Sequence, residues 1–155
     1  MHKRVEKARD LFLSGFNCSQ SVLGAFNDIF GIDDNTAFGI SAGLGSGVGR
    51  LRNVCGGVSA ASMIIGLVHG AREGSDTEAK AETYRIVREF AEKVTEIRGS
   101  YICSELMQRQ SEKSYIPEER TEEYYKKRPC VAIVMTCAEL ICEYLEEWGI
   151  DTQIN

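Results

Sequence analysis

The sequence has few of the residues that build linkers and lacks the long apolar runs that cross a membrane. Only two of its 155 residues are proline, at positions 117 and 129, so no rigid proline-rich linker divides the chain. The longest nearly apolar runs, residues 58–68 and 131–136, are shorter than the about 20 residues that a membrane-spanning helix needs. We therefore expect a single domain, residues 1–155, with no membrane insertion.

An excess of basic charge is also missing. The net charge is −5, and no concentrated basic face is visible that could neutralise phosphates, which argues against a nucleic-acid partner. The first sixteen residues include Glu6 and Asp10 in a helical pattern, in place of the continuous apolar run and cleavage site of a secretory signal. We expect a cytoplasmic protein.

The period-2 alternation of β-strands is absent as well, and the apolar residues instead recur with helical spacing. The fold is therefore predicted to be all-α, a compact single-domain bundle of about six to seven helices. Residues 108–128 are polar and charged, with weak helical character around 118–127, and we expect them to form a surface insertion. Among the helix boundaries, we predict a second helix that runs from Asn17 to Gly31, and a capping box of Ser75 and Glu78 that opens the longest helix.

The glycine-rich stretch Gly43 to Gly49 lacks the spacings of a dinucleotide-binding or nucleoside-triphosphate-binding loop. Glycine allows close approach of one backbone segment to another, because it has no Cβ. We predict that this stretch lets the backbone approach the helix starts that carry cysteines.

Six cysteines are present, but none of them form a C-x-x-C pair. This absence argues against a zinc ribbon or a thioredoxin-like site. In a reducing compartment six cysteines rarely form a disulfide framework, so catalysis, metal binding or simple burial are the remaining explanations.

Four of the six cysteines share a position that favours reactivity. Each is expected in the first turn of a helix, after a residue that starts helices: Cys18 after Asn17, Cys55 after Asn53, Cys103 after Ser100, and Cys130 after Pro129. A helix N-terminus offers unpaired N–H groups and a partial positive charge, which favour a thiolate over a thiol. These four are the candidate catalytic residues and, alternatively, the candidate metal ligands.

The geometry of the last helix separates Cys130 from its neighbours in sequence. Cys137 lies seven residues further on, about 10 Å along the axis, which is too far for a disulfide. Cys137 and Cys142 cannot pair either, because five residues place them on different sides of the helix. We predict that Cys137 and Cys142 are buried core residues, and that a partner for Cys130 comes from elsewhere in the fold.

Basic neighbours distinguish two of the four candidates. Residues 126–128 are Lys-Lys-Arg directly before Cys130, and Arg50 and Arg52 precede Cys55. A nearby cation stabilises a thiolate. We therefore predict that Cys130 or Cys55 is the attacking thiolate.

Four segments of the chain resemble a known family. They are residues 15–22 (GFNCSQSV), 55–60 (CGGVSA), 103–106 (CSEL) and 130–134 (CVAIV). In their order and spacing they are similar to the putative redox-active protein family named for four cysteines in the pattern C…CGAxxG…C…C, over roughly residues 8–145. The chain departs from the motif at Gly57, in place of alanine, and at Ala60, in place of the final glycine. The resemblance implies that Cys18, Cys55, Cys103 and Cys130 are the characteristic cysteines, and that the protein is redox-active.

Two classes of function follow from these observations. The first is a small redox protein, a thiol- or metal-dependent oxidoreductase with an unidentified redox partner. In it the four thiolates act by thiol/disulfide exchange without a cofactor, or bind an iron–sulfur cluster or zinc. This redox class predicts at least two of the four sulfurs within bonding or co-ligating distance.

The second class is a non-enzymatic helical module for interaction or homo-oligomerisation with buried structural cysteines. It predicts separated sulfurs and an exposed apolar patch on the last helix.

Overall fold

The computed structural model describes residues 1–109 and 113–154. This part of the chain folds into eight α-helices and two short 3-10 segments, with no β-strand, which confirms the all-α prediction. Residues 110–112 of the predicted insertion lie outside the described residues. The α-helices are α1 (Lys3–Leu13), α2 (Cys18–Gly24), α3 (Asp34–Ser41), α4 (Gly56–His69), α5 (Thr77–Arg98), α6 (Cys103–Met107), α7 (Glu122–Lys127) and α8 (Cys130–Glu147); the 3-10 segments are η1 (Asn27–Phe30) and η2 (Ala42–Leu44).

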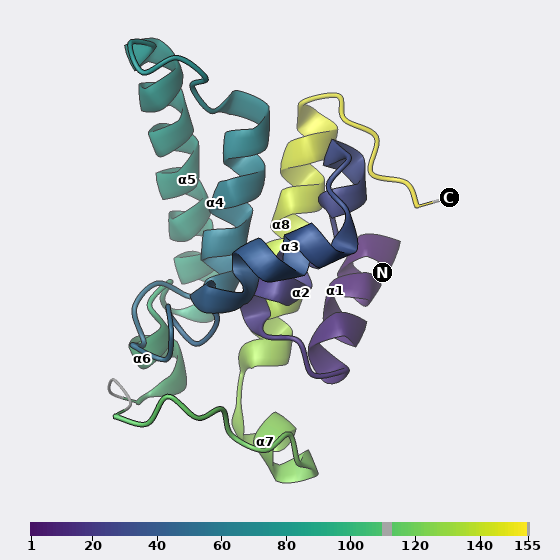
Figure 1. Ribbon diagram of the computed structural model, residues 1–155, viewed down its shortest axis with the longest axis vertical. Coiled ribbons are helices and arrows are strands. Elements are labelled where there is room, and N and C mark those ends of the chain that lie inside the picture. Colours follow the sequence, from purple (N-terminus) through teal and green to yellow (C-terminus); the bar gives the residue numbers. More distant parts are fainter. Residues whose placement is uncertain (110–112, 155) are drawn as a thin grey trace.

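The short helix α2 lies at the centre of the bundle. It packs against α1, α3, α4 and α8, while α5 packs on the outer side of α4 and also contacts α8 (Figure 1). The interfaces are filled by apolar side chains that are fully buried, among them Leu23, Phe26, Ile64, Phe90 and Ile141. Within the described residues, no helix is long and apolar enough to cross a membrane.

The predicted second helix is not continuous, because it stops at Gly24 and resumes as the 3-10 segment η1. The buried guanidinium of Arg4 explains the break, since its Nη1 donates to the carbonyl oxygen of Ala25 at 2.9 Å. In a continuous helix that oxygen would accept from Ile29, whose N–H instead donates to Phe26. The element still ends at Gly31, as predicted, with a left-handed φ of 68°.

The N-cap of the longest helix is Asp76, so the prediction of a Ser75 and Glu78 capping box was wrong. The Oδ1 atom of Asp76 accepts from the N–H of Ala79 at 3.0 Å. A carboxylate in this position also interacts favourably with the positive end of the helix dipole, which a serine hydroxyl does not.

The two ends of the chain are joined by buried polar contacts. Arg4, only 1% exposed, donates from Nε to the carbonyl oxygen of Thr152 at 2.6 Å and pairs with Asp28 at 2.6 Å. His2 Nε2 lies 3.0 Å from Thr152 Oγ1. These contacts hold the segment that follows α8, and η1, against the start of α1.

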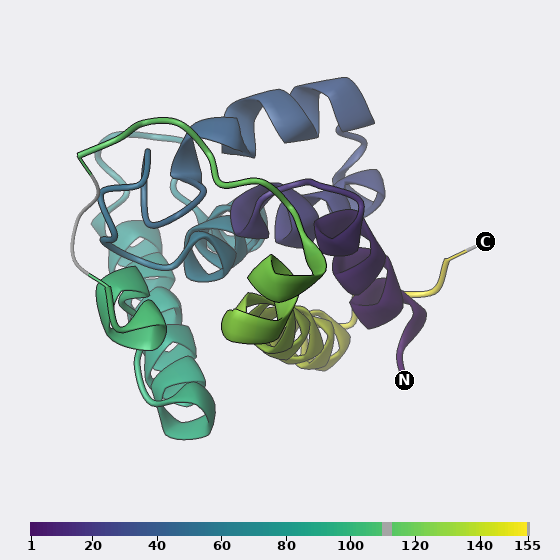
Figure 2. The same ribbon diagram turned by 90° about the horizontal axis from the view of Figure 1, so that it is seen from below.

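At one end of the bundle, the first residues of α2, α4, α6 and α8 come together. Seen from below, residues 113–128 run across this end and lead through α7 into α8 (Figure 2). The loop after η2 lies beside the same helix starts (Figures 1 and 2). The four helix starts and these two segments together form the candidate site.

Candidate functional site

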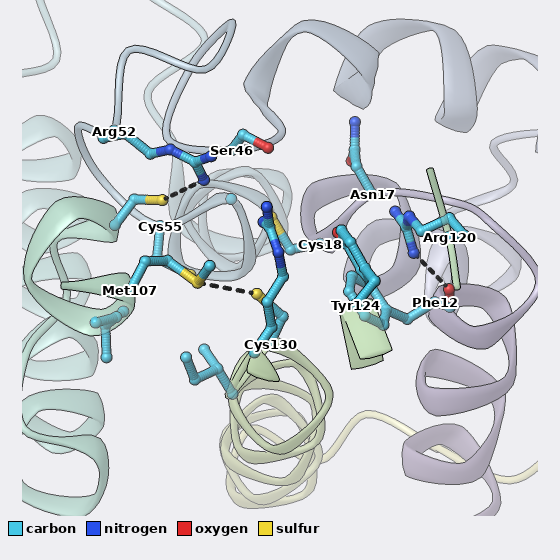
Figure 3. Close-up of a pocket in the computed structure, with 15 residues that line it drawn as sticks. Phe12, Asn17, Cys18, Ser46, Arg52, Cys55, Met107, Arg120, Tyr124 and Cys130 are labelled. Atoms are coloured by element: carbon cyan, nitrogen blue, oxygen red, sulfur yellow. Dashed lines mark hydrogen bonds between the residues drawn. The ribbon is translucent and has the colours of Figure 1, made fainter. Parts of the chain in front are cut away.

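All four characteristic cysteines line one pocket. Cys18, Cys103 and Cys130 are the first residues of their helices and Cys55 is the N-cap of α4, so the helix-start positions are as predicted. The pocket has a volume of about 40 Å³, enough for only a few water-sized groups. Figure 3 shows the side chains of Cys18 and Cys130 directed into it, with Met107 beside them. The four segments therefore converge in space, although they are far apart in sequence.

The start of α2 is built by a complete capping box. Asn17 Oδ1 accepts from the N–H of Gln20 at 2.9 Å, and Gln20 Oε1 accepts from the N–H of Asn17 at 3.1 Å. Because both side chains satisfy backbone donors at this end, the first turn begins sharply at Cys18. The predicted helix start at Asn17 is confirmed.

The starts of α4 and α6 are held together by backbone hydrogen bonds. Cys55 donates its N–H to the carbonyl oxygen of Tyr101 at 2.9 Å, and Cys103 donates its N–H to that of Asn53 at 2.6 Å. Asn53 therefore joins the two helix starts and does not cap α4, which has no side-chain cap. Ser100 does not cap α6 either, since its Oγ accepts from the N–H of Ile102, the residue directly before the helix.

The loop that follows η2 has an unusual backbone. Five consecutive residues, 46–50, have φ between 53° and 69°, the left-handed region, which costs a residue with a Cβ about 1–2 kcal/mol. The turn is closed by the N–H of Asn53, which donates to the carbonyl oxygen of Gly47 at 2.9 Å. A Cβ on Gly47 would lie 2.5 Å from that nitrogen, and one on Gly45 would overlap the Asn17 side chain. The glycines thus allow the close approach that the sequence predicted.

Cys18 and Cys55 form a hydrogen-bonded pair of sulfurs. The hydrogen bond from the Cys55 thiol lowers the pKa of Cys18 to about 6, against the opposing effect of burial. Backbone N–H groups of Ser46, Ser19 and Gly56 lower that pKa further. The same contact with Cys18, together with burial, raises the pKa of Cys55 well above its usual value. The pair therefore holds one negative charge on Cys18 and one proton on Cys55 near neutral pH.

Gly56 makes room for the Cys18 sulfur. A Cβ at this position would overlap Cys18 Sγ, so any other residue would push the sulfur away from the first N–H groups of α4. These N–H groups have no partner inside their own helix and stabilise an anion. The glycine that follows Cys55 in the motif is thus required by the position of the other cysteine.

Cys103 and Cys130 lie in the same pocket with protonated thiols. Burial raises the pKa of Cys103, and the Arg52 guanidinium, whose Nη1 is 3.6 Å from its sulfur, partly offsets this. Burial and the charge on Cys18 raise the pKa of Cys130 to about 12, and its thiol contacts the sulfur of Met107 at 3.5 Å.

The prediction that Cys130 or Cys55 carries the activated thiolate was therefore wrong. The basic residues before Cys130 face carboxylates: Arg128 pairs with Glu118 at 2.6 Å, and Lys127 pairs with Glu123 at 2.7 Å. Arg128 still lowers the pKa of Cys130, but burial and the charge on Cys18 outweigh it.

Arg120 and Tyr124, from the segment predicted as a surface insertion, form part of the pocket wall. Arg120 donates to the carbonyl oxygens of Phe12 and Phe16, each at 3.0 Å, and its guanidinium lies 4.8 Å from the centre of the Tyr124 ring. Ser46 and Met107 were also missed. No local motif marks any of these four residues, because each reaches the pocket only through the tertiary fold.

The two remaining cysteines are core residues, as predicted. Cys137 is fully buried and Cys142 is 4% exposed. Burial raises the pKa of both thiols, that of Cys142 to about 12. All six cysteines are free thiols.

The arrangement of the thiols does not match that of a metal site. Within residues 1–109 and 113–154, no group of three or more histidine, cysteine or acidic side chains is placed to hold a metal ion. Two of the four candidate sulfurs contact other groups: Cys103 accepts from Arg52, and Cys130 contacts Met107.

Of three comparisons with known proteins, only the one with protein-family models gave a match. No curated protein and no solved structure matched the chain. A family model described as "Putative redox-active protein (C_GCAxxG_C_C)" matches residues 16–144, which include all four cysteines of the pocket and most of the chain. The protein thus belongs to this cysteine-motif family of putative redox-active proteins.

Proposed function

We propose that the protein carries out thiol/disulfide exchange, with Cys18 as the attacking thiolate and Cys55 as the resolving thiol. The observation that carries this proposal is the contact between the two sulfurs, with one proton shared by the pair. Membership of a family described as redox-active is consistent with it.

The attacking sulfur needs both charge and access. Cys18 is partly exposed, whereas Cys55 and Cys103 are only 6% and 7% exposed. With a pKa of about 6, Cys18 is mostly thiolate at pH 7, and the thiolate is the form that attacks disulfides. Cys130 is as accessible but is protonated at this pH.

The proposed reaction needs only the substrate disulfide and this pair. The Cys18 thiolate forms a bond to one substrate sulfur, the substrate S–S bond breaks, and the other half leaves as a thiolate. Cys55 then attacks Cys18 Sγ, transfers its proton to a departing thiolate, and releases the second half. The substrate is reduced by two electrons, and the pair is oxidised to a Cys18–Cys55 disulfide.

Cys103 and Cys130 have a different role in this proposal. Their protonated thiols border the pocket without competing for the first attack. They remain candidate members of the site because they lie within the same pocket wall as the first pair.

The rival function, an interaction module with inert cysteines, has less support. It predicts an exposed apolar patch on the last helix. Among the described residues, the large exposed apolar side chains lie elsewhere, for example Leu51, Tyr84 and Ile116, and none lies on α8. It also predicts separated sulfurs, whereas Cys18 and Cys55 are in contact.

A thiol count and a disulfide map test the proposed function. We would purify the protein without oxygen, measure iron, zinc and labile sulfide, then titrate it with a small disulfide and count free thiols. The expected result is a metal-free protein that falls from six thiols to four, with a Cys18–Cys55 disulfide found by peptide mapping. Six thiols throughout, or stoichiometric iron or zinc bound by the four cysteines, would contradict the proposal.

A further inference from the structure

A second, larger cavity lies beside the cysteine pocket. It is a groove of about 450 Å³, a volume typical of small-molecule sites. The groove and the cysteine pocket share one wall, formed by Asn17, Ser46, Arg52, Arg120, Tyr124 and Arg128. A small molecule in the groove would therefore lie beside the wall of the pocket that holds Cys18.

The groove is strongly basic, although the whole chain carries a net charge of −5. Four arginines line it, Arg50, Arg52, Arg120 and Arg128, and Glu118 is the one acidic residue among the described residues of its wall. Figure 3 shows Cys18 between Arg52 and Arg120. Guanidinium groups gathered in a concave site attract anions and bind them through directed N–H groups.

The internal contacts of the groove show which anion it suits. Glu118 accepts from Arg109 and Arg128, each at 2.6 Å, and lies 3.8 Å from Arg50. Burial alone would raise the pKa of Glu118, but the two hydrogen-bonded arginines lower it to about 2. The arginines thus already hold one carboxylate, and the described wall of the groove carries four arginines beside this single acidic residue.

The backbone that positions two of these arginines is strained. Arg50 and Arg52 have φ of 66° and 62°, in the left-handed region that residues with a Cβ rarely adopt. Such strain persists where the surrounding structure enforces it, and it clusters at ligand-binding sites. The strained loop places both arginines in the wall of the groove that adjoins the cysteine pocket.

We propose that this groove binds the carboxylate of a small disulfide and so presents its S–S bond to Cys18. This inference rests on the proposed function and names the class of its substrate. With the carboxylate held by the arginines, Cys18 Sγ bonds to the nearer sulfur. The S–S bond breaks, and the leaving half departs as a thiolate before Cys55 resolves the mixed disulfide.

Two disulfide reagents of similar size, one anionic and one neutral, test the proposal. Dithiobis(nitrobenzoate) carries a carboxylate on each half, and dithiodipyridine is neutral at pH 7. Rate constants for both would be measured with the reduced full-length protein, and with an unstructured cysteine peptide as reference. We expect the ratio of the carboxylated to the neutral rate constant to be about tenfold higher for the protein, and to fall as potassium chloride is added.

Two variants and a matched control assign the effect to the groove. Arg50→Gln is expected to lower the ratio by about fivefold, because one guanidinium is lost. Glu118→Gln is expected to raise it, because the arginines lose their internal carboxylate. Arg85→Gln should leave it unchanged, since Arg85 lies on α5 and pairs with Glu82 and Glu89. A ratio equal to that of the peptide, or unmoved by Arg50→Gln, or lowered by Glu118→Gln, would overturn the proposal.

A binding measurement keeps this proposal separate from the proposed function. The Cys18→Ser variant cannot react at this position, so its affinity for a non-reactive nitrobenzoate thioether reports the groove alone. Saturable binding that Arg50→Gln weakens about fivefold is the expected result, and no saturable binding would contradict the groove. Slow reaction of the unmodified protein with both disulfides would instead contradict Cys18 as the attacking thiolate.

Discussion

Two sulfurs lie against adjacent glycines at the start of α4 and have opposite properties. A Cβ on Gly56 would overlap Cys18 Sγ, and one on Gly57 would lie 2.9 Å from Cys137 Sγ. Yet the pKa of Cys18 is lowered to about 6 by the Cys55 thiol and backbone N–H groups, whereas burial raises that of Cys137. The difference shows that neighbouring groups that donate hydrogen bonds, more than burial, decide which sulfur is a thiolate.

Cys130 extends this comparison, because it is the first residue of α8 and still has a raised pKa. A place at a helix start is therefore not sufficient. The sulfur must also be directed at unpaired N–H groups, as Cys18 is at those of Ser46, Ser19 and Gly56.

The largest expected effect comes from removing one of the two compared sulfurs. At pH 7 a thiol with a pKa of about 6 has about thirtyfold more thiolate than an ordinary cysteine. Cys18→Ser should therefore slow the fastest alkylation by iodoacetamide about thirtyfold, and Cys137→Ser should leave it unchanged. Equal effects of the two substitutions would remove the distinction between these cysteines.

Adding a methyl group at each glycine tests the same comparison more finely. Gly56→Ala is expected to slow Cys18 alkylation about tenfold, because the sulfur is displaced from its donors, and to lower the free energy of unfolding by about 2 kcal/mol. Gly57→Ala should cost about 1 kcal/mol through contact with Cys137, without slowing Cys18. Alkylation rates and urea unfolding give both values, and an unaffected Cys18 in Gly56→Ala would contradict this account of the motif glycine.

The thiol hydrogen bond itself can be removed or replaced. Cys55→Ala should raise the pKa of Cys18 by about one to two units. The alkylation rate of Cys18 would then reach half its maximum at a higher pH, and it would be lower at pH 7. Cys55→Ser should cause a smaller increase, since a hydroxyl still donates. The measurement is the pH at which the Cys18 rate is half its maximum. A Cys18 profile in Cys55→Ala that is identical to that of the unmodified protein would show that the Cys55 contact does not lower the pKa.

The smallest expected effect concerns the cap that positions Cys18. Asn17→Ala removes the capping box of α2 and should lower the free energy of unfolding by about 1 kcal/mol. It should also slow Cys18 alkylation about twofold, through a less ordered first turn. The matched control is Asp76→Ala at the cap of α5, which should lower stability by about the same amount without changing the alkylation rate. A similar change in rate for both variants would mean that the effect follows overall stability.

The sequence predicted the features that depend on local residues. Asn17 and Pro129 start the helices that begin with Cys18 and Cys130, and glycines end several helices, because capping acts over a few residues only. The all-α fold followed from helical periodicity in the same way. The break after Gly24 could not be predicted, since it depends on the buried Arg4, about twenty residues earlier.

The choice of reactive sulfur also depends on tertiary contacts. Ser46 reaches Cys18 through a left-handed loop that includes Val48, a residue that rarely adopts positive φ, so no local rule predicts it. Arg128 precedes Cys130 by two residues and lowers its pKa, but burial and the charge on Cys18, which comes from another helix, have the larger effect. Basic residues near a cysteine in sequence therefore do not determine its pKa until its burial and its neighbours in the fold are known.

The most direct test of the central claim is a titration of each cysteine in the intact protein. The reduced protein would be alkylated briefly with iodoacetamide at pH values from 4 to 10, and the label on each cysteine quantified by peptide mass spectrometry. We predict that Cys18 is labelled first, with half its maximal rate near pH 6, and that Cys130 and Cys137 stay unlabelled at neutral pH. If Cys18 reacted only above about pH 8.5, as an ordinary thiol does, or no faster than Cys130, the account of Cys18 as the reactive thiolate would be contradicted.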